Sequence, residues 1–329
     1  MTTTPPDIPM PAVARFDGAT EAWVLTRYVD VLTALREPRL TASGARGGGE
    51  LDRADHRRFR AQASATASEM LDEWLTRLEP LARDMVRALP RDRPVDLVGE
   101  LAKPWSVQMA SRLVCPGGDP ERMTALAGDI FAAAAEPRDA ALQARAEPST
   151  LELVGRFSGQ LAAFQVQAFI ALSQTLPCFL ANAWLALLND PERAEMLRAE
   201  PELMPQAIEE LLRHSGPSRA QFRRAAEDMA LGGAAIAKGD RVALMLAAAN
   251  RDPEQFPDPD KLDFRRGSPR HLALGDGKHG CIGAPLVRAA AAAATAGFLE
   301  CFAGARLEEP VEWRGGFAIC APACLRVSR

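Results

Sequence analysis

The chain has 329 residues, of which 47% are hydrophobic and 25% charged, and its formal net charge is −4. This length and apolar content suffice for a large core, so we expect a single domain over residues 1–329, with residues 1–20 as a loosely ordered tail. The lack of a basic excess argues against nucleic-acid binding. The polar, proline-rich start is typical of neither a signal peptide nor a membrane anchor.

Six cysteines are scattered along the chain without the spacing of a disulfide framework. This usage suits a reducing compartment, and we expect a cytoplasmic protein. With four histidines and no C-x-x-C pair, the sequence also disfavours a zinc site. Five of the cysteines fit the usual role of a small buried hydrophobic residue: Cys115, Cys178, Cys301, Cys320 and Cys324.

Apolar residues at helical spacing dominate the chain and predict long helices. In chain order these are expected over Met70–Leu89, Pro120–Ala135, Leu151–Leu188, Pro201–His214 and Pro285–Phe302. Clusters of glycine and proline punctuate the chain at residues 44–49, 116–120, 189–191 and 252–259. Short strands are expected only near the start, near Val242 and in the C-terminal tail. The predicted fold class is therefore mainly α with minor β.

Cys281 lies in the most distinctive segment, Leu-Gly-Asp-Gly-Lys-His-Gly-Cys-Ile-Gly-Ala-Pro at residues 274–285. Gly275, Gly277 and Gly283 allow tight turns and the close approach of a flat group. An alanine-rich helix follows directly, and its N-terminus favours a thiolate over a thiol. A thiolate presented on such a loop suits the axial position of a haem iron.

The same glycines allow a second interpretation. Residues 275–280 match G-x-G-x-x-G, the fingerprint of a dinucleotide-binding turn. The preceding Arg-His-Leu-Ala-Leu is a poor strand, however, and no β–α–β alternation surrounds it. The dinucleotide interpretation is therefore the weaker of the two.

Residues 274–283 resemble the haem-binding loop of the cytochrome P450 family, Phe-x-x-Gly-x-x-x-Cys-x-Gly, with Leu274 in place of the usual phenylalanine. The continuation Gly-Ala-Pro-Leu-Val-Arg is similar to that of soluble bacterial members. The resemblance extends over nearly the whole chain. It implies the cytochrome P450 fold and haem b, with Cys281 as the axial ligand of the iron.

Two further segments resemble motifs that stabilise the cysteine side of this family. Glu210 and Arg213 match its Glu-x-x-Arg pair, which is buried beneath the haem, and their spacing places them on one helix face. Residues 250–261 resemble the family's meander, but Lys261 stands where an arginine is usual. Lysine keeps the charge and loses the two-pronged hydrogen bonding, so this member of the triad departs from the pattern.

The resemblance also implies residues that hold the haem propionates. His56 and Arg60 match the family's His-x-x-x-Arg, and four-residue spacing puts both on one helix face. Arg223 matches a propionate arginine further along the chain, and His279 a further propionate contact. Together with Gly275, Gly277 and Gly283 these residues form the predicted cofactor site.

The central helix departs from the family where oxygen is activated. The usual Ala-Gly-x-Asp/Glu-Thr becomes Ala171-Leu172-Ser173-Gln174-Thr175, so the threonine is kept and the acid is replaced by an amide. Glutamine can hydrogen-bond but cannot deliver a proton at neutral pH. Leu172 brings a branched side chain toward the expected oxygen groove, and Pro177 is expected to kink the helix. Simple drift and a change of chemistry explain these departures equally well.

The chain is shorter than a usual member, and the resemblance places the loss in two segments. Only the glycine-rich residues 44–49 stand for the long B–C region, and too few residues follow Glu136 for a full F–G helical pair. These segments usually cover the substrate pocket. An exposed apolar face is costly, so we expect a homodimer whose helices cover it.

The remaining wall of the pocket is unusually polar for the family. Ser218, Arg219 and Gln221 stand at positions that are usually apolar, although Arg219 could instead turn to solvent or to a propionate. Ala171 and Leu172 on the central helix and Phe317 in the tail complete the predicted substrate contacts. Such a site suits a small, partly polar molecule.

Three functions remain open. The first is a P450 monooxygenase of secondary metabolism, with Thr175 and Gln174 at the oxygen site and electrons from a ferredoxin and its reductase, docked near Arg288 and Lys278. The second is the same haem thiolate used with peroxide or in dehydration or rearrangement. The third is a non-catalytic haem binder or scaffold, which is disfavoured because every haem-holding motif survives.

Overall fold

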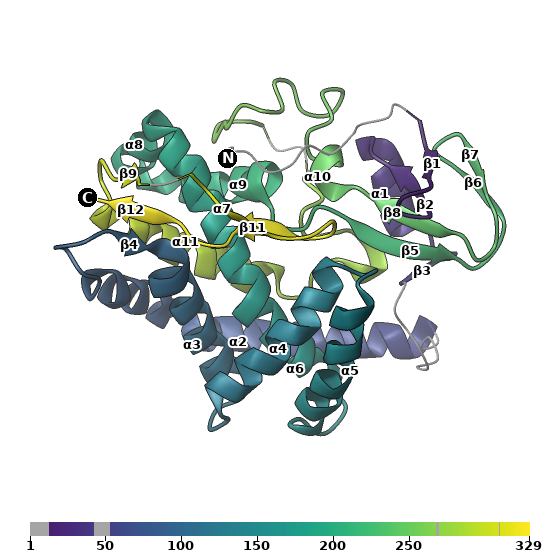
Figure 1. Ribbon diagram of the computed structural model, residues 1–329, viewed down its shortest axis with the longest axis horizontal. Helices are drawn as coiled ribbons and strands as arrows, with labels where there is room; N and C mark the ends of the chain where they lie inside the picture. Colours follow the sequence, from purple (N-terminus) through teal and green to yellow (C-terminus); the bar gives the residue numbers. More distant parts are fainter. Residues whose placement is uncertain (1–12, 43–52, 268–269, 309) are drawn as a thin grey trace.

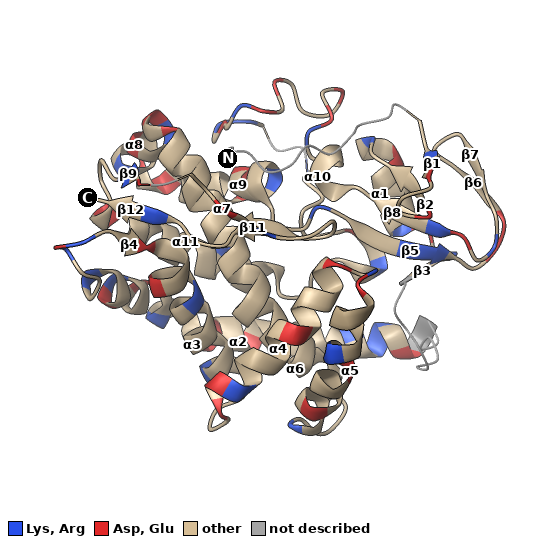
Figure 2. Ribbon diagram, in the orientation of Figure 1, with Lys and Arg blue, Asp and Glu red and all other residues tan. Residues whose placement is uncertain are grey.

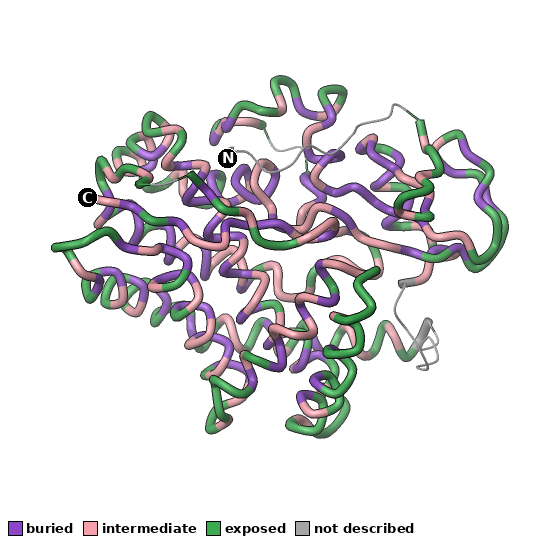
Figure 3. The backbone as a smooth tube through the Cα atoms, viewed as in Figure 1, coloured by how far each residue is buried: buried purple, intermediate pink, exposed green. Residues whose placement is uncertain are grey.

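A computed structural model describes residues 13–42, 53–267, 270–308 and 310–329. The centre of the molecule is one long apolar helix, formed by α6 (Ala162–Ile170), the π-helical turn η2 (Ala171–Thr175) and α7 (Leu176–Asn189) (Figure 1). Trp184 and Leu180 on this helix are fully buried in the main core. Figure 3 shows that buried residues concentrate along it, whereas the peripheral turns are exposed.

The apolar character of this helix follows from its central position. Among the described residues, Ala162–Asn189 is the one helix long and apolar enough to cross a membrane, and 61% of its most apolar window is buried in the protein. Burial against neighbouring helices therefore accounts for its composition.

Further helices surround the central one and supply the rest of the main core. Their bounds are α2 Arg53–Arg87, η1 Leu97–Ala102, α3 Lys103–Val114, α4 Pro120–Ala135, α5 Ala140–Gly155, α8 Pro191–Ala199, η3 Pro201–Leu203, α9 Met204–Ser215, η4 Gly277–His279 and α11 Ala284–Cys301. The mainly α class is thereby confirmed, and the helices predicted at 120–135, 201–214 and 285–302 are present within a few residues.

The prediction of a continuous helix from Leu151 to Leu188 is wrong. The chain leaves the helix after Gly155 and re-enters it at Ala162, with Gly159 at a φ of +83°. Residues 151–155 therefore end α5, which lies against α4. These two helices stand directly before the central helix, so a helical pair is present where the sequence left too little room for a full one. Each of the two has 16 residues.

The strands gather mainly at one end of the molecule, on the right in Figure 1. Within the described residues the largest sheet has five strands in the order β1-β2-β8-β5-β3, and β2 and β8 are parallel. Two short helices, α1 Tyr28–Arg36 and α10 Leu246–Ala249, belong to this end. The strand bounds are β1 Arg15–Asp17, β2 Ala22–Leu25, β3 Leu40–Ala42, β5 Gln221–Ala225, β6 Met229–Leu231, β7 Ala234–Ile236 and β8 Arg241–Leu244.

The C-terminal strands lie against the helical part. β12 (Arg326–Ser328) pairs with both β4 (Val95–Asp96) and β9 (Arg306–Leu307), and β10 (Trp313–Gly315) forms a hairpin with β11 (Cys320–Pro322). The hairpin tip reaches α4, because the Ala318 N–H donates to the Ala135 carbonyl over 3.1 Å. This contact brings the tail, the helical pair and the central helix together.

Two predictions concern the start of the chain. Residues 15–17 do not belong to a loose tail, because β1 pairs with β2 in the register Phe16↔Trp23. The remainder of the predicted tail up to residue 12 and the glycine-rich segment 44–49 lie outside the described residues. A single domain over 1–329 stays a prediction.

Candidate haem-thiolate site

Cys281 sits between the short helix η4 and the first turn of α11, as the sequence predicts. Its N–H donates to the Leu274 carbonyl over 2.8 Å, which closes the loop. Gly275 has a φ of +68°, a conformation that favours glycine. Gly277 has a φ of +65°, and a Cβ there would lie 2.8 Å from the Leu35 carbonyl oxygen. Gly277 therefore packs closely against α1, and its role at the cofactor stays a prediction.

The thiol of Cys281 is not activated by its surroundings alone. Burial raises its pKa, while a hydrogen bond from the Gly283 N–H and the charges of Arg288 and Arg60 lower it. Without an iron, the effect of burial outweighs these favourable contacts at the helix N-terminus, so the thiol form is favoured. Coordination to a metal deprotonates a thiol outright, so ligation rather than the helix end would make the thiolate.

The four residues predicted to hold propionates come together from three separate parts of the chain. His56 and Arg60 project from α2, Arg223 from β5 and His279 from η4. The His56 and His279 rings meet edge to face at 5.4 Å between centroids, and Arg60 donates to the Gly280 carbonyl over 2.8 Å. The grouping is what a shared ligand requires, and the propionate role of these residues stays a prediction.

Arg60 and Arg223 in this cluster donate to carbonyl and amide oxygens, and within the described residues no carboxylate pairs with either of them or with His279. His279 Nε2 is buried without a hydrogen-bond partner in the described part of the chain. Burial lowers the pKa of Arg223, and burial together with the charge of Arg223 lowers that of His279 to about 4. A carboxylate placed among them would supply the missing partner, so these residues fit haem propionates.

Glu210 and Arg213 on α9 form a buried ion pair with two parallel hydrogen bonds of 2.7 and 2.8 Å. The third member of the triad is Arg266, whose Nε lies 3.1 Å from Glu210 Oε1. Lys261 contributes only its backbone carbonyl, to Arg213 and to Arg266. The arginine expected at position 261 is thus supplied five residues later.

The central helix changes its winding at the predicted oxygen site. η2 is a π-helical turn that ends just before Leu176 and Pro177. Because proline has no N–H, it cannot complete an α-helical bond, and a π turn absorbs this defect without breaking the helix. Ala171 is exposed and Thr175 half-buried, four residues apart on one face.

The side chains of Leu172 and Gln174 do not lie on the face formed by Ala171 and Thr175. Leu172 is only 3% exposed and belongs to the main core, which corrects its assignment to the oxygen groove and the substrate. The Gln174 amide donates to the Thr124 carbonyl of α4 over 3.2 Å and lines a cavity that Thr175 does not line. The amide is therefore part of the contact between α4 and the central helix.

The predicted substrate wall is partly assembled. Ser218 bridges to Ile319, and Phe317 at the hairpin tip packs on Phe222 with ring centroids 5.6 Å apart. Arg219 and Gln221 have other partners. The Arg219 side chain donates to the Cys320 sulfur, and Gln221 Oε1 accepts from Arg223 over 2.8 Å. Gln221 thus orients Arg223, and its contact with substrate stays a prediction.

Comparison with known proteins decides the family. The model of the family Cytochrome P450 matches residues 187–308. The chain is 31% identical to Cytochrome P450 107B1 of Saccharopolyspora erythraea, over 89% of this chain and 86% of that protein. It is also 31% identical to the Nocardicin C N-oxygenase of Nocardia uniformis, over 95% of this chain and 91% of that protein.

This chain belongs to the cytochrome P450 family. Its fold agrees: the solved structure of CYP164A2 from Mycobacterium smegmatis superposes with a TM-score of 0.86 at 23% identity, over 96% of this chain and 93% of that one. The protein is accordingly a P450-type oxidoreductase that uses haem b, with residues that fit the cofactor as described above. Haem bound through a thiolate supplies the oxygen-activating chemistry of such enzymes.

The comparison also bears on the length of this P450. The alignment with Cytochrome P450 107B1 runs over 349 positions but takes in only 89% of a 329-residue chain. That relative therefore contains segments with no counterpart here, which agrees with the predicted shortening.

Sequence reasoning missed one feature of the cysteine side. Asp276 binds two arginines from different elements, Arg36 at 2.9 Å and Arg270 at 3.3 Å. These charges lower its pKa against the effect of its burial. The only sequence signal was an acidic residue inside the glycine loop.

Proposed function

We propose that this P450 is a monooxygenase that inserts one oxygen atom of O₂ into a small, partly polar substrate. The other oxygen atom leaves as water, with two electrons from a reduced ferredoxin and two protons from solvent. The observation that carries this proposal is Thr175, retained beside the exposed Ala171 on one face of the π turn. Its hydroxyl can hold a proton donor in place there.

Substrate contacts are proposed from the residues that remain near this face. Ala171, Ser218 and Phe317 are exposed or half-buried, and Ser218 and the hairpin tip are joined by the bridge to Ile319. A wall that mixes a hydroxyl with aromatic and aliphatic surface suits an amphipathic molecule. A role in secondary metabolism is supported by a relative whose name is Nocardicin C N-oxygenase.

The decisive experiment compares two ways of driving the reaction. The reduced, carbonyl-bound protein should show the long-wavelength Soret band of a thiolate ligand. Absence of this band would exclude both the monooxygenase and the alternative haem-thiolate enzyme that uses peroxide or catalyses a dehydration or rearrangement. Product from NADPH, ferredoxin and reductase, but not from peroxide alone, supports the monooxygenase. Product from peroxide alone would instead establish a peroxide-driven enzyme, and product without any oxidant would establish a dehydration or rearrangement.

A ferredoxin is the proposed electron donor, and the face around Asp276 is its proposed docking site. Arg288, one of the two cations expected to guide it, is held by Glu209 in a two-pronged ion pair of 2.5 and 2.9 Å. Arg36 and Arg270, in contrast, share one carboxylate and remain 54% and 72% exposed. Together with Lys278 they leave a positive surface beside the Cys281 loop, which suits an acidic partner.

Two further proposals concern the protein as a whole. A cytoplasmic location is supported by the bacterial relatives and by the buried position of the most apolar helix. A homodimer is supported by Leu151 and Val154, which lie on one face of α5 and are 72% and 44% exposed. Sedimentation at micromolar concentration tests it: Leu151→Glu should convert a dimer to a monomer, and a monomeric parent protein would refute it.

A further inference from the structure

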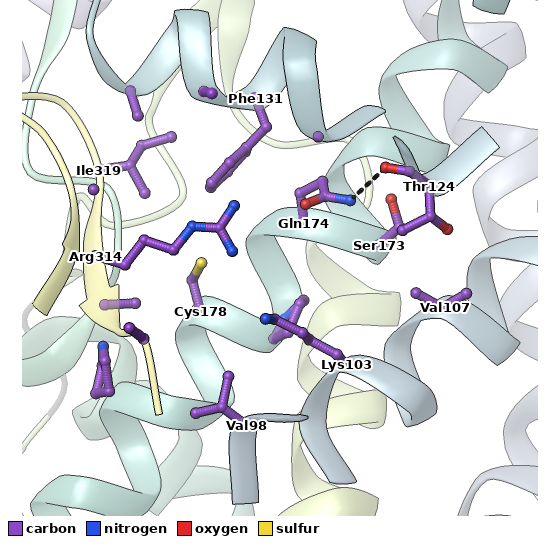
Figure 4. A pocket seen from close by; sticks show the side chains of 18 of the residues that line it. Val98, Lys103, Val107, Thr124, Phe131, Ser173, Gln174, Cys178, Arg314 and Ile319 are labelled. Carbon is purple, nitrogen blue, oxygen red and sulfur yellow. Dashed lines mark hydrogen bonds between the residues drawn. The ribbon is translucent and has the colours of Figure 1, made fainter. Parts of the chain in front are cut away.

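A cavity of about 470 Å³ lies beside the central helix, between α3, α4 and the β10–β11 hairpin (Figure 4). Its walls are mainly apolar, and they include Val98, Val107, Phe131, Leu142 and Ile319. The volume falls in the range of small-molecule sites. Ser173, Gln174, Pro177 and Cys178 line it from the central helix, whereas Ala171 and Thr175 do not. The cavity therefore lies along a different side of the central helix from Ala171 and Thr175, and it shares Ile319, which bridges to Ser218, with the proposed substrate wall.

Two cations enter this cavity from different elements. Lys103 begins α3 and is half-buried, and Arg314 lies in β10 and is exposed. Figure 4 shows the Arg314 guanidinium above the Cys178 sulfur and the Lys103 ammonium on another side of it, and the charges of both act on this thiol. Neither forms an ion pair with a described carboxylate, and the one carboxylate in the lining, Glu136, is packed against Gly316. The described lining thus has an excess of positive charge.

Cys178 does not supply the missing negative charge. Burial raises the pKa of its thiol to about 11, despite the opposing charges of Arg314 and Lys103. The thiol therefore stays neutral at physiological pH and leaves both cations available to an external anion.

The opposite part of the cavity contains polar groups without partners. Ser173 is 2% exposed, and its hydroxyl makes no hydrogen bond to the described residues; the Thr124 hydroxyl is likewise buried and unpaired. Buried hydroxyls are normally hydrogen-bonded, so these two indicate a bound water or guest molecule. They are an observation independent of the two cations.

We propose that this cavity is a second ligand site, which binds a small amphipathic carboxylate. The carboxylate lies between Lys103 and Arg314, where the guanidinium can donate two parallel hydrogen bonds. The apolar body extends along Val107 and Phe131 toward the central helix. Carboxylate is favoured over free phosphate because most of the lining is apolar and requires a hydrophobic body. The site does not depend on the monooxygenase proposal.

Binding to the haem-loaded protein is tested by calorimetry with decanoate, and with decanol as the uncharged match. Decanoate should bind with one site per chain, and Lys103→Gln or Arg314→Gln should each weaken it about tenfold, as expected for one charge-assisted contact. The same substitutions should leave decanol binding unchanged. Lys238→Gln, an exposed lysine outside the cavity, is the matched control and should have no effect.

Two further experiments test whether decanoate binds in this cavity. Ala132→Phe fills the cavity and should abolish binding of both probes while haem content and melting temperature stay near those of the parent. Imidazole, which occupies the iron, should leave decanoate binding intact. Unchanged affinity in the Lys103→Gln/Arg314→Gln double variant, or loss of binding with imidazole, would overturn the proposal without affecting the proposed oxygenation.

Discussion

At the scale of single residues, a side chain's role depends on the partner that folding gives it. Arg60, Arg223 and His279 gather with no carboxylate among the described residues, and this deficit supports their proposed contact with the haem propionates. Gln221 was expected at the substrate, and its amide oxygen accepts from Arg223. Gln174 was expected at the oxygen site, and its amide donates to Thr124. A partner such as Thr124, 50 residues away in the chain, could not be predicted from local sequence.

The replacement of the usual acid by Gln174 gives a first prediction. Gln174→Glu should leave the share of electrons that appear in product within about twofold of the parent, because the side chain at this position is turned to Thr124 and to a cavity that Thr175 does not line, out of reach of a proton relay at Thr175. The measurement compares product formed with NADPH consumed. Gln174→Leu is the control, since it loses the bond to Thr124 and gains no proton. A roughly tenfold rise in Gln174→Glu that is absent from Gln174→Leu would show that a carboxyl at this position does deliver protons.

His214, at the end of α9, gives a prediction on pH. Burial first, and then the charges of Arg251 and Arg213, lower its pKa to about 4. Between the usual value near 6.5 and this one, the unfolded chain binds a proton that the folded chain does not. Stability should therefore fall as the pH drops from about 6.5 to about 4.

Replacing His214 isolates the contribution of this residue to the pH dependence of stability. Denaturant unfolding of His214→Gln should depend less on pH across that window than unfolding of the parent protein. Above pH 7 the difference between the two proteins should be constant. A parallel decline of both proteins from pH 6.5 to 4 would contradict the assignment.

At the scale of elements, buried contacts join segments that are distant in the chain. The Glu210–Arg213 pair on α9 receives Arg266 and the backbone of residues 250–263, so it fixes the long loop beneath the cysteine side. The π turn η2 lets the central helix continue despite Pro177. The break at residues 156–161 separates α5 from the central helix and makes the pair with α4 possible.

Arg266 and Lys261 provide a matched test of the triad. Arg266→Ala should destabilise the protein by about 3 kcal/mol, because it removes one partner of a buried ionic group. Lys261→Ala should have little effect, since the Lys261 residue is exposed and contributes its backbone carbonyl. Denaturant unfolding of both variants measures the difference. Equal losses would mean that the lysine side chain does take the arginine's place.

At the scale of the whole molecule, basic and acidic residues are interspersed along the helices and loops rather than separated by sign (Figure 2). A net charge of −4 gives no general attraction for an acidic partner. A local excess of positive charge would attract such a partner instead. One such excess lies at Arg36 and Arg270, which share Asp276 beside the Cys281 loop.

Electron delivery should depend on this local excess. Arg270→Gln should slow reduction by ferredoxin several-fold at low ionic strength and hardly at all near 1 M salt, where charges are screened beyond about 3 Å. Stopped-flow reduction of the haem measures the rate. Lys238→Gln, on a distant β-turn, should behave like the parent. A salt-independent rate, equal in all three proteins, would place docking elsewhere.

The sequence by itself determined the family and the cofactor, and it predicts Cys281 as the axial ligand, because this cysteine and its glycines lie within a dozen consecutive residues whose conformation is local. It also determined the mainly α class, since helical periodicity is a short-range property. The tertiary structure alone decided that Arg266 completes the triad and that Leu172 belongs to the core. It also decided that Lys103 and Arg314 line one cavity with Cys178. These are relations between segments tens to hundreds of residues apart, and packing, not local pattern, brings them together.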